Sequence, residues 1–153
     1  MGGIPGVKPT RVVIIGAGTV AEYAARSAMA LGAVVNVFDN SVARLRRIQS
    51  DINFPIATSI MQPKVLEKAL KRADVAIGAL RAKEGRTPCV ISDEMVQKMK
   101  PKSVIVDVSI DQGGCFETSE VTTHESPTFI KHGVIIMVFR ILHHGLQKQL
   151  LFH

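Results

Sequence analysis

Apolar runs alternate along the chain with segments whose apolar residues recur at helical spacing. Runs rich in β-branched residues predict buried strands at 11–15, 34–38, 55–59, 75–79, 103–108 and 134–139. Helical periodicity predicts helices at 19–31, 42–50, 63–72 and 92–99. Strands that are apolar throughout are typical of a parallel sheet covered by helices on both faces. The pattern therefore predicts an α/β fold with a Rossmann-like, doubly wound parallel sheet.

The turn after the first predicted strand carries a nucleotide-binding motif. The sequence "GAGTVA" at 16–21 is the G-x-G-x-x-A form of the dinucleotide fingerprint. Gly16 would permit the tight turn, Gly18 would let the backbone approach a pyrophosphate, and Ala21 would let the helix pack closely on the strand. The phosphates would lie on free N–H groups at the helix start, at Thr19 and Val20. Alone, the motif also fits an ordinary strand–helix turn.

An acidic residue at the end of the second predicted strand strengthens this interpretation. Asp39 follows Gly16 at about the 20-residue spacing expected of the acid that binds the adenosine ribose hydroxyls. A carboxylate there would repel a 2′-phosphate, which favours NAD over NADP. Arg44, in the next predicted helix, is either a cofactor contact or a solvated helix residue. We therefore predict that the glycine turn and Asp39 form a dinucleotide site.

A second carboxylate follows the fifth predicted strand. Asp111 precedes Gln112, Gly113 and Gly114. Ligands of open α/β sheets bind outside the carboxyl ends of the strands, so Asp111 should face the nicotinamide side of the same crevice. It could stabilise a developing iminium cation or position a water molecule there. Alternatively, Asp111 caps the following turn and the glycines only shape it.

Composition and charge narrow the classes of function. The net charge is +6, but the basic residues recur at helical spacing without interleaved aromatics, which favours solvated helix faces over a nucleic-acid surface. No apolar run approaches the ~18 residues of a membrane span. The N-terminus has no signal-peptide pattern. Cys89 and Cys115 share no motif spacing, so we expect a reducing, cytoplasmic compartment and no metal site.

Three stretches of the chain resemble bacterial NAD-dependent alanine dehydrogenases. They are "GGIPGVKPTRVVIIGAGTVAEYAA" at 2–25, "ADVAIGAL" at 73–80 and "VDVSIDQGGCFETSEVTTHESPTF" at 106–129. This family converts L-alanine, NAD and water to pyruvate, ammonia and NADH, generally as a homohexamer. The related soluble subunit of NAD(P) transhydrogenase typically has Glu before Gln-Gly-Gly and Asn after it. Asp111 and Cys115 therefore favour the dehydrogenase.

The resemblance also implies roles for individual residues. Asp111 matches the family's catalytic aspartate, which would act at the imine and carbinolamine stages, and Asp39 matches its ribose-binding acid. Ala79, Leu80 and Ile110 match positions whose backbone contacts the cofactor. The resemblance thus predicts the NAD-binding domain of an alanine dehydrogenase.

The N-terminal end of the chain departs from this family. Residues 1–9 resemble an interdomain linker, and residues 10–135 would form the NAD-binding domain. The family's substrate-binding arginine and lysine and its catalytic histidine belong to a preceding domain, and His124 and His132 match no catalytic position. We expect the isolated chain to bind NAD weakly and not to turn over alanine. A separate chain could supply the missing groups, and a stand-alone NAD-binding module or a basic nucleic-acid binder are the other hypotheses.

The segment 136–153 also departs from the family, which typically continues "HYGVPNIPSRVAKTASFA". Codons chosen for that string and read one base later give nearly the sequence "IMVFRILHHGLQKQLLFH" found here. We interpret 136–153 as a frameshifted tail, whose start is apolar enough to complete a strand by accident. His143 and His144 are then not expected to bind a metal, because further ligands are lacking. Exposed leucines in this tail would favour aggregation.

Overall fold

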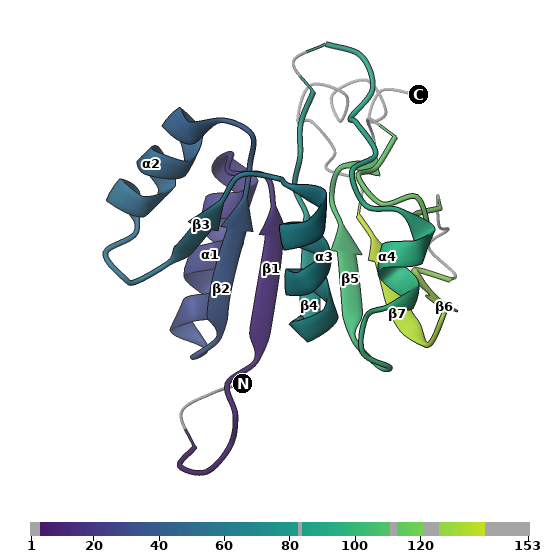
Figure 1. Cartoon of the computed structure of the whole chain (residues 1–153), viewed down its shortest axis with the longest axis horizontal. Coiled ribbons are helices and arrows are strands. Elements are labelled where there is room, and N and C mark those ends of the chain that lie inside the picture. Colours follow the sequence, from purple (N-terminus) through teal and green to yellow (C-terminus); the bar gives the residue numbers. More distant parts are fainter. Residues whose placement is uncertain (1–3, 83, 111–112, 121–125, 140–153) are drawn as a thin grey trace, which may run out of the picture.

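The computed structural model describes residues 4–82, 84–110, 113–120 and 126–139, and within them the chain forms one sheet (Figure 1). The sheet has seven strands in the order β3-β2-β1-β4-β5-β7-β6. The strands are β1 (Arg11–Ile15), β2 (Val34–Phe38), β3 (Ala57–Ser59), β4 (Val75–Gly78), β5 (Val104–Asp107), β6 (Thr128–Lys131) and β7 (Val134–Val138). The helices are α1 (Thr19–Ala30), α2 (Val42–Asp51), α3 (Pro63–Arg72) and α4 (Asp93–Gln97).

The sheet confirms the predicted doubly wound fold. Neighbouring strands from β3 to β7 pair in parallel, and the order reverses direction between β1 and β4. This reversal is the topological switch point at which α/β proteins bind ligands. The carboxyl ends of β1 and β4 therefore mark where a site is expected.

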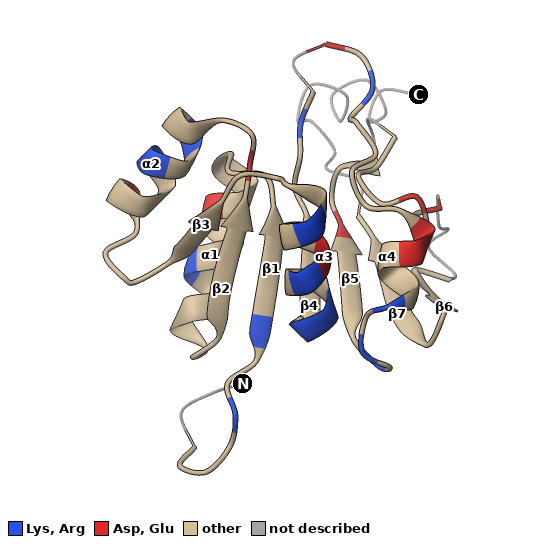
Figure 2. Ribbon diagram, in the orientation of Figure 1, with Lys and Arg blue, Asp and Glu red and all other residues tan. Residues whose placement is uncertain are grey.

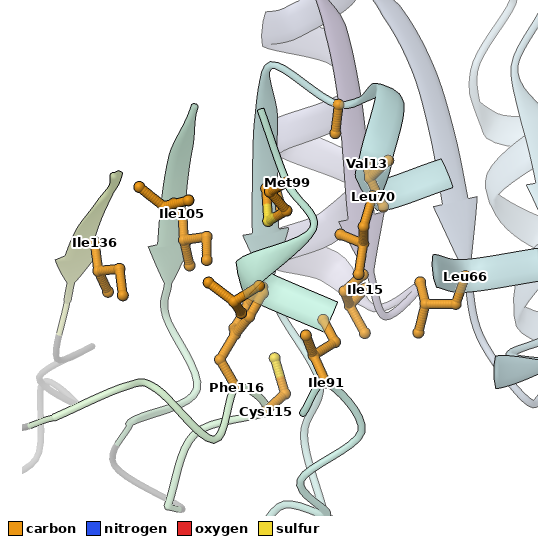
Figure 3. Packing of buried hydrophobic residues seen from close by; sticks show 14 of the residues in the cluster. Val13, Ile15, Leu66, Leu70, Ile91, Met99, Ile105, Cys115, Phe116 and Ile136 are labelled. Carbon is orange, nitrogen blue, oxygen red and sulfur yellow. The ribbon is translucent and has the colours of Figure 1, made fainter. Parts of the chain in front are cut away.

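Both faces of the sheet are buried, which explains the continuous apolar strands. On one face Val13 and Ile15 of β1 pack with Leu66 and Leu70 of α3, in the cluster shown in Figure 3. On the other face, alternate residues of β1 pack against α1 and α2. Because successive side chains of a strand point to opposite faces, β1 has to be apolar at almost every position.

The predicted helix starts are confirmed where the structure shows a capping contact. The hydroxyl of Ser41 accepts a hydrogen bond from the Arg44 backbone N–H at 3.3 Å, and Ser92 caps α4 in the same way. In contrast, α1 begins after Gly18, and no side chain caps it. The free N–H groups at the start of α1 are thus open to another acceptor.

Two predicted elements are shorter in the structure, and a third element was not predicted. The helix predicted at 92–99 is shortened to Asp93–Gln97, and the strand predicted at 55–59 is shortened to Ala57–Ser59. Strand β6 was not predicted, since it lies at the sheet edge with Ile130 exposed. The segment forms a strand because it pairs antiparallel with β7. This is a tertiary contact, and an exposed edge strand does not need the continuous apolar run that identifies a buried strand in the sequence.

The start of the segment interpreted as frameshifted packs inside the sheet. Ile136 of β7 is fully buried and lies opposite Ile105 of β5, and Val138 is also buried. The strand predicted at 134–139 is therefore confirmed as β7. His143 and His144 lie outside the described residues, and the frameshift remains a hypothesis.

Many of the basic residues lie on the exposed faces of helices. Figure 2 shows basic residues along α3, where Lys64, Lys68, Lys71 and Arg72 are all exposed. Some of these charges are balanced nearby, since Glu67 of α3 pairs with Lys98 at 2.8 Å. Among the described residues, no helix has the length and apolar character of a membrane span, and no three potential ligands cluster as a metal site.

Candidate functional site

The glycine turn is fixed between the ends of β2 and β4. Gly16 has a φ of +110°, and its N–H donates to the carbonyl of Phe38 at 2.7 Å. A Cβ atom at Gly16 would lie 2.6 Å from the backbone oxygen of Ala79. Side chains are disfavoured by both the conformation and the close approach. Gly16 is therefore required for this turn, as the motif predicted.

Gly18 differs from Gly16 because its missing side chain faces open space. Its φ is −86°, and a Cβ atom placed there would meet no heavy atom within 4 Å. Three residues later, Ala21 is fully buried where α1 packs on the sheet. The three small residues of the motif thus have separate roles: a tight turn, an open approach to the helix start, and close helix packing.

Asp39 is buried at the end of β2 and holds two backbone groups. One carboxylate oxygen accepts the Ala17 N–H at 2.9 Å, and the other accepts the Ser41 N–H at 2.7 Å. The guanidinium of Arg44 lies 4.0 Å from the carboxylate. Asp39 therefore joins the glycine turn to the start of α2. Each carboxylate oxygen has two lone pairs, so capacity to accept a further hydroxyl remains.

A pocket of about 480 Å³ opens where these elements meet. It lies between the start of α1, the first turns of α2 and the segment after β4. The lining residues are Gly18, Thr19, Val20, Ala43, Arg44, Arg47, Ala79 and Arg81. The N-terminus of the 12-residue helix α1 brings its positive dipole end and free N–H groups to this pocket. Such a pocket is suited to a phosphate-bearing ligand.

Three arginines give the pocket a basic lining, and only one was among the predicted site residues. Arg44 was predicted, whereas Arg47 and Arg81 were not. Arg47 also donates from its guanidinium to the carbonyl of Ala17 at 3.1 Å, so it supports the glycine turn directly. Its three-residue spacing from Arg44, which puts both on one face of α2, was a signal available in the sequence.

The predicted site residues separate into groups. Those lining the pocket are Gly18, Thr19, Val20, Arg44 and Ala79. Gly16 and Asp39 shape the turn beside it, whereas Leu80 and Ile110 pack with the hydrophobic cluster on the α3 side of the sheet. Asp111 lies outside the described residues. The structure thus collects the predicted phosphate-binding residues in one place.

The two cysteines differ in accessibility. Cys89 is exposed and Cys115 is buried, and both are free thiols. Burial raises the pKa of the Cys115 thiol. The Cys89 thiol is only partly desolvated, and this, together with the nearby Glu117 carboxylate, raises its pKa as well. Thiols with raised pKa are poor nucleophiles at neutral pH. The raised pKa values therefore give no sign of an activated nucleophile at Cys89 or Cys115.

Comparison with known proteins agrees with this geometry. The family model "Alanine dehydrogenase/PNT, C-terminal domain" matches residues 1–142. The alanine dehydrogenase of Mycolicibacterium smegmatis is 47% identical over 135 residues, which cover 88% of this chain and 36% of that protein. The chain therefore spans about a third of the length of this curated relative.

Solved structures give the same assignment. An L-alanine dehydrogenase superposes with a TM-score of 0.87 at 39% identity, covering 92% of this chain and 39% of the other. A transhydrogenase from Sinorhizobium meliloti gives a TM-score of 0.72 at 25% identity, covering 88% of this chain and 38% of the other. With a family match over nearly its whole length, this chain belongs to the alanine dehydrogenase/PNT C-terminal domain family.

Proposed function

We propose that this chain is the NAD-binding domain of an L-alanine dehydrogenase. The observation that carries the proposal is the basic pocket at the start of α1, where Gly18 leaves the uncapped helix end open. A pyrophosphate needs N–H donors, positive potential and close backbone approach, and this pocket offers all three. The family match supports a nicotinamide dinucleotide as the ligand.

Different residues of the site would bind different parts of the cofactor. Thr19 and Val20 supply backbone N–H groups of the first helical turn for the pyrophosphate, and Arg47 supplies positive charge beside it. Asp39 lies at the end of β2, where an acid binds the adenosine ribose. The adenine half would then lie over β2 and the nicotinamide half over β4 and β5. Ala79, Leu80 and Ile110 are the proposed backbone contacts on that side.

The proposal favours NAD over NADP. A 2′-phosphate on the adenosine ribose would approach the Asp39 carboxylate, which is held by two backbone N–H groups. Arg44 lies 4.0 Å from that carboxylate and offsets part of its negative charge. We therefore propose a preference for NAD rather than complete exclusion of NADP.

In the full-length enzyme, bound NAD would accept hydride from the α-carbon of L-alanine. Asp111 is the proposed catalytic residue of this segment, and it lies outside the described residues. We propose that the family's other properties also apply to the full-length protein: L-alanine and pyruvate as substrates, a homohexameric assembly and a cytoplasmic location. The 153-residue chain alone should bind NAD without turning over alanine.

Two adjacent arginines of α2 provide a matched test of this function. Arg47 lines the pocket, whereas the exposed neighbour Arg46 is not among its lining residues. Titration of the chain with NADH, followed by nicotinamide fluorescence, should show saturable binding that Arg47→Ala weakens and Arg46→Ala leaves unchanged. Equal losses in both variants would indicate a general charge effect and would count against the pocket. Oxidation of NADH by the chain with pyruvate and ammonia would refute its inactivity.

A further inference from the structure

A buried carboxylate that the proposed function does not use lies at the end of β5. Asp107 is fully buried, although the rest of β5 is apolar. Among the described residues, no cation forms a salt bridge with it. A buried charge is costly unless hydrogen bonds satisfy it, so its partners should explain its presence.

Among the described residues, the hydrogen-bond partners of the Asp107 carboxylate belong to the turn that follows β5, defined here as residues 108–110 and 113–119. One oxygen, Oδ1, accepts the Ser109 backbone N–H at 2.9 Å and the Ser109 hydroxyl at 2.6 Å. The other, Oδ2, accepts the Cys115 N–H at 3.2 Å and the Ser119 hydroxyl at 2.7 Å. Each oxygen thus binds a different flank of the β5 turn, before and after residues 111–112.

The two flanks also bond directly to each other around Asp107. Gly114 donates its N–H to the Ser109 carbonyl at 3.0 Å, and Gly113 donates to the Ile110 carbonyl at 2.9 Å. Gly114 has a φ of +77°, and a Cβ atom there would lie 2.9 Å from Oδ2 of Asp107. A glycine is needed here because the carboxylate occupies the space that a side chain would take.

The β5 turn rests against the end of β4 and the hydrophobic core. The N–H of Val108 donates to the Gly78 carbonyl at 2.9 Å, and a Cβ atom at Gly78 would clash with the Cys115 sulfur. Figure 3 shows Cys115 and Phe116 within the core cluster. Gly78 directly precedes Ala79 of the pocket lining, so the turn is fixed relative to the pocket wall.

We propose that Asp107 is a positioning residue that fixes the β5 turn for the nicotinamide half of the dinucleotide. This inference rests on the proposed function, which places that half over β4 and β5. The turn contains Ile110, a proposed backbone contact, and its flanks enclose Asp111 in the sequence. Asp107 itself is buried and would act only through the turn.

A ligand lacking nicotinamide separates positioning from general structural support. ADP-ribose retains the adenine, both riboses and the pyrophosphate, so it would occupy the part of the site that Gly18 and Asp39 form. Loss of the Asp107 contacts should weaken NADH binding and leave ADP-ribose binding unchanged. Damage to the whole domain would weaken both ligands together.

The test compares Ser119→Ala with Ser103→Ala. Ser119 bonds to Asp107, whereas Ser103 precedes β5 at its opposite end and bonds to the Lys100 carbonyl at 2.6 Å. Each variant loses one hydroxyl hydrogen bond, but only Ser119→Ala loosens the turn. Ser119→Ala should bind NADH at least about fivefold more weakly, as is typical for coupling between neighbouring sites. Asp107→Asn replaces one carboxylate oxygen with an NH₂ group, which cannot accept the hydrogen bonds that this oxygen accepts. NADH binding should therefore weaken more in Asp107→Asn than in Ser119→Ala.

The outcomes distinguish this inference from the proposed function. Positioning by Asp107 would be supported if Ser119→Ala binds NADH more weakly but binds ADP-ribose as before. In that case Ser103→Ala should bind both ligands as the unmodified chain does. The inference would be overturned if Ser119→Ala binds both ligands more weakly, or if it binds both as tightly as the unmodified chain. Failure of the unmodified chain to bind either ligand would instead refute the proposed function. If Asp107→Asn does not fold, Ser119→Ala still decides the question.

Discussion

Gly16 and Gly18 belong to the same motif, but substituting them should have different consequences. Replacing Gly16 should lower the stability of the fold, whereas replacing Gly18 should weaken cofactor binding. Gly16→Ala adds a methyl group to a residue with a φ of +110°, at 2.6 Å from the Ala79 oxygen. That oxygen cannot easily move, because the Ala79 N–H is bonded to the Ile15 carbonyl at 2.8 Å. Gly18→Ala adds the same group where the backbone is extended and where no atom lies within 4 Å.

The structure allows both costs to be estimated. For Gly16→Ala, backbone strain contributes about 1–3 kcal/mol, and overpacking contributes about 1–3 kcal/mol more. The reduced freedom of the unfolded chain offsets about 0.4–1 kcal/mol of this cost. The net loss of stability is therefore about 1–6 kcal/mol. For Gly18→Ala, a poorer helix cap costs up to ~1 kcal/mol, and the same unfolded-state gain of about 0.4–1 kcal/mol nearly cancels it.

Urea denaturation and NADH titration of both variants test this contrast. Gly16→Ala should lose a large part of a typical stability of about 5–15 kcal/mol. Gly18→Ala should keep its stability but bind NADH at least about tenfold more weakly, because the methyl group enters the pocket. If Gly18→Ala binds NADH as tightly as the unmodified chain, the pyrophosphate does not lie at the start of α1. If Gly16→Ala keeps its stability, the close approach to Ala79 is not a constraint.

Three further predictions follow from named contacts. Asp39→Ala should lower the free energy of unfolding by about 1–3 kcal/mol as well as NAD affinity, because the Ala17 N–H loses its acceptor; unchanged stability in denaturant would contradict this structural role. The Arg11 backbone N–H, and after it Lys100, lowers the pKa of Asp74 below its ordinary 3.8, although partial burial opposes this. The folded pKa is depressed, so this contact stabilises the fold above about pH 4 and is lost as the pH falls through the folded pKa. Asp74→Asn should therefore reduce the acid sensitivity of unfolding, and an identical pH profile would refute the assignment. With a thiol reagent, the native chain should expose Cys89 and protect Cys115 until denaturant is added; rapid labelling of both thiols in the native state would show that Cys115 is not buried.

The sequence predicted most elements because their signals are local. The doubly buried strand β1 requires apolar residues on both faces, and Ser41 and Ser92 cap the helices that follow them. Gly16 and Ala21 were interpretable for the same reason, because their roles depend on backbone geometry within one turn. Features of this kind can be predicted because they depend only on residues that are close together in the sequence.

Other features depend on contacts between distant segments and could not be predicted in the same way. Strand β6 depends on pairing with β7, and Arg81 reaches the pocket only because β4 lies beside β1. Asp107 is an intermediate case. A carboxylate within the apolar run "VIVDV" was a visible anomaly, but its partners Cys115 and Ser119 are found only through the folded turn.

The central claim is that the glycine turn, Asp39 and the end of β4 form a site for an adenine dinucleotide. Calorimetric titration of the 153-residue chain with NAD, beside Gly18→Ala as the control, tests it most directly. We predict saturable binding of NAD to the unmodified chain and a marked loss in the folded control. Absence of binding to the folded, unmodified chain, or equal binding to both, would contradict the claim.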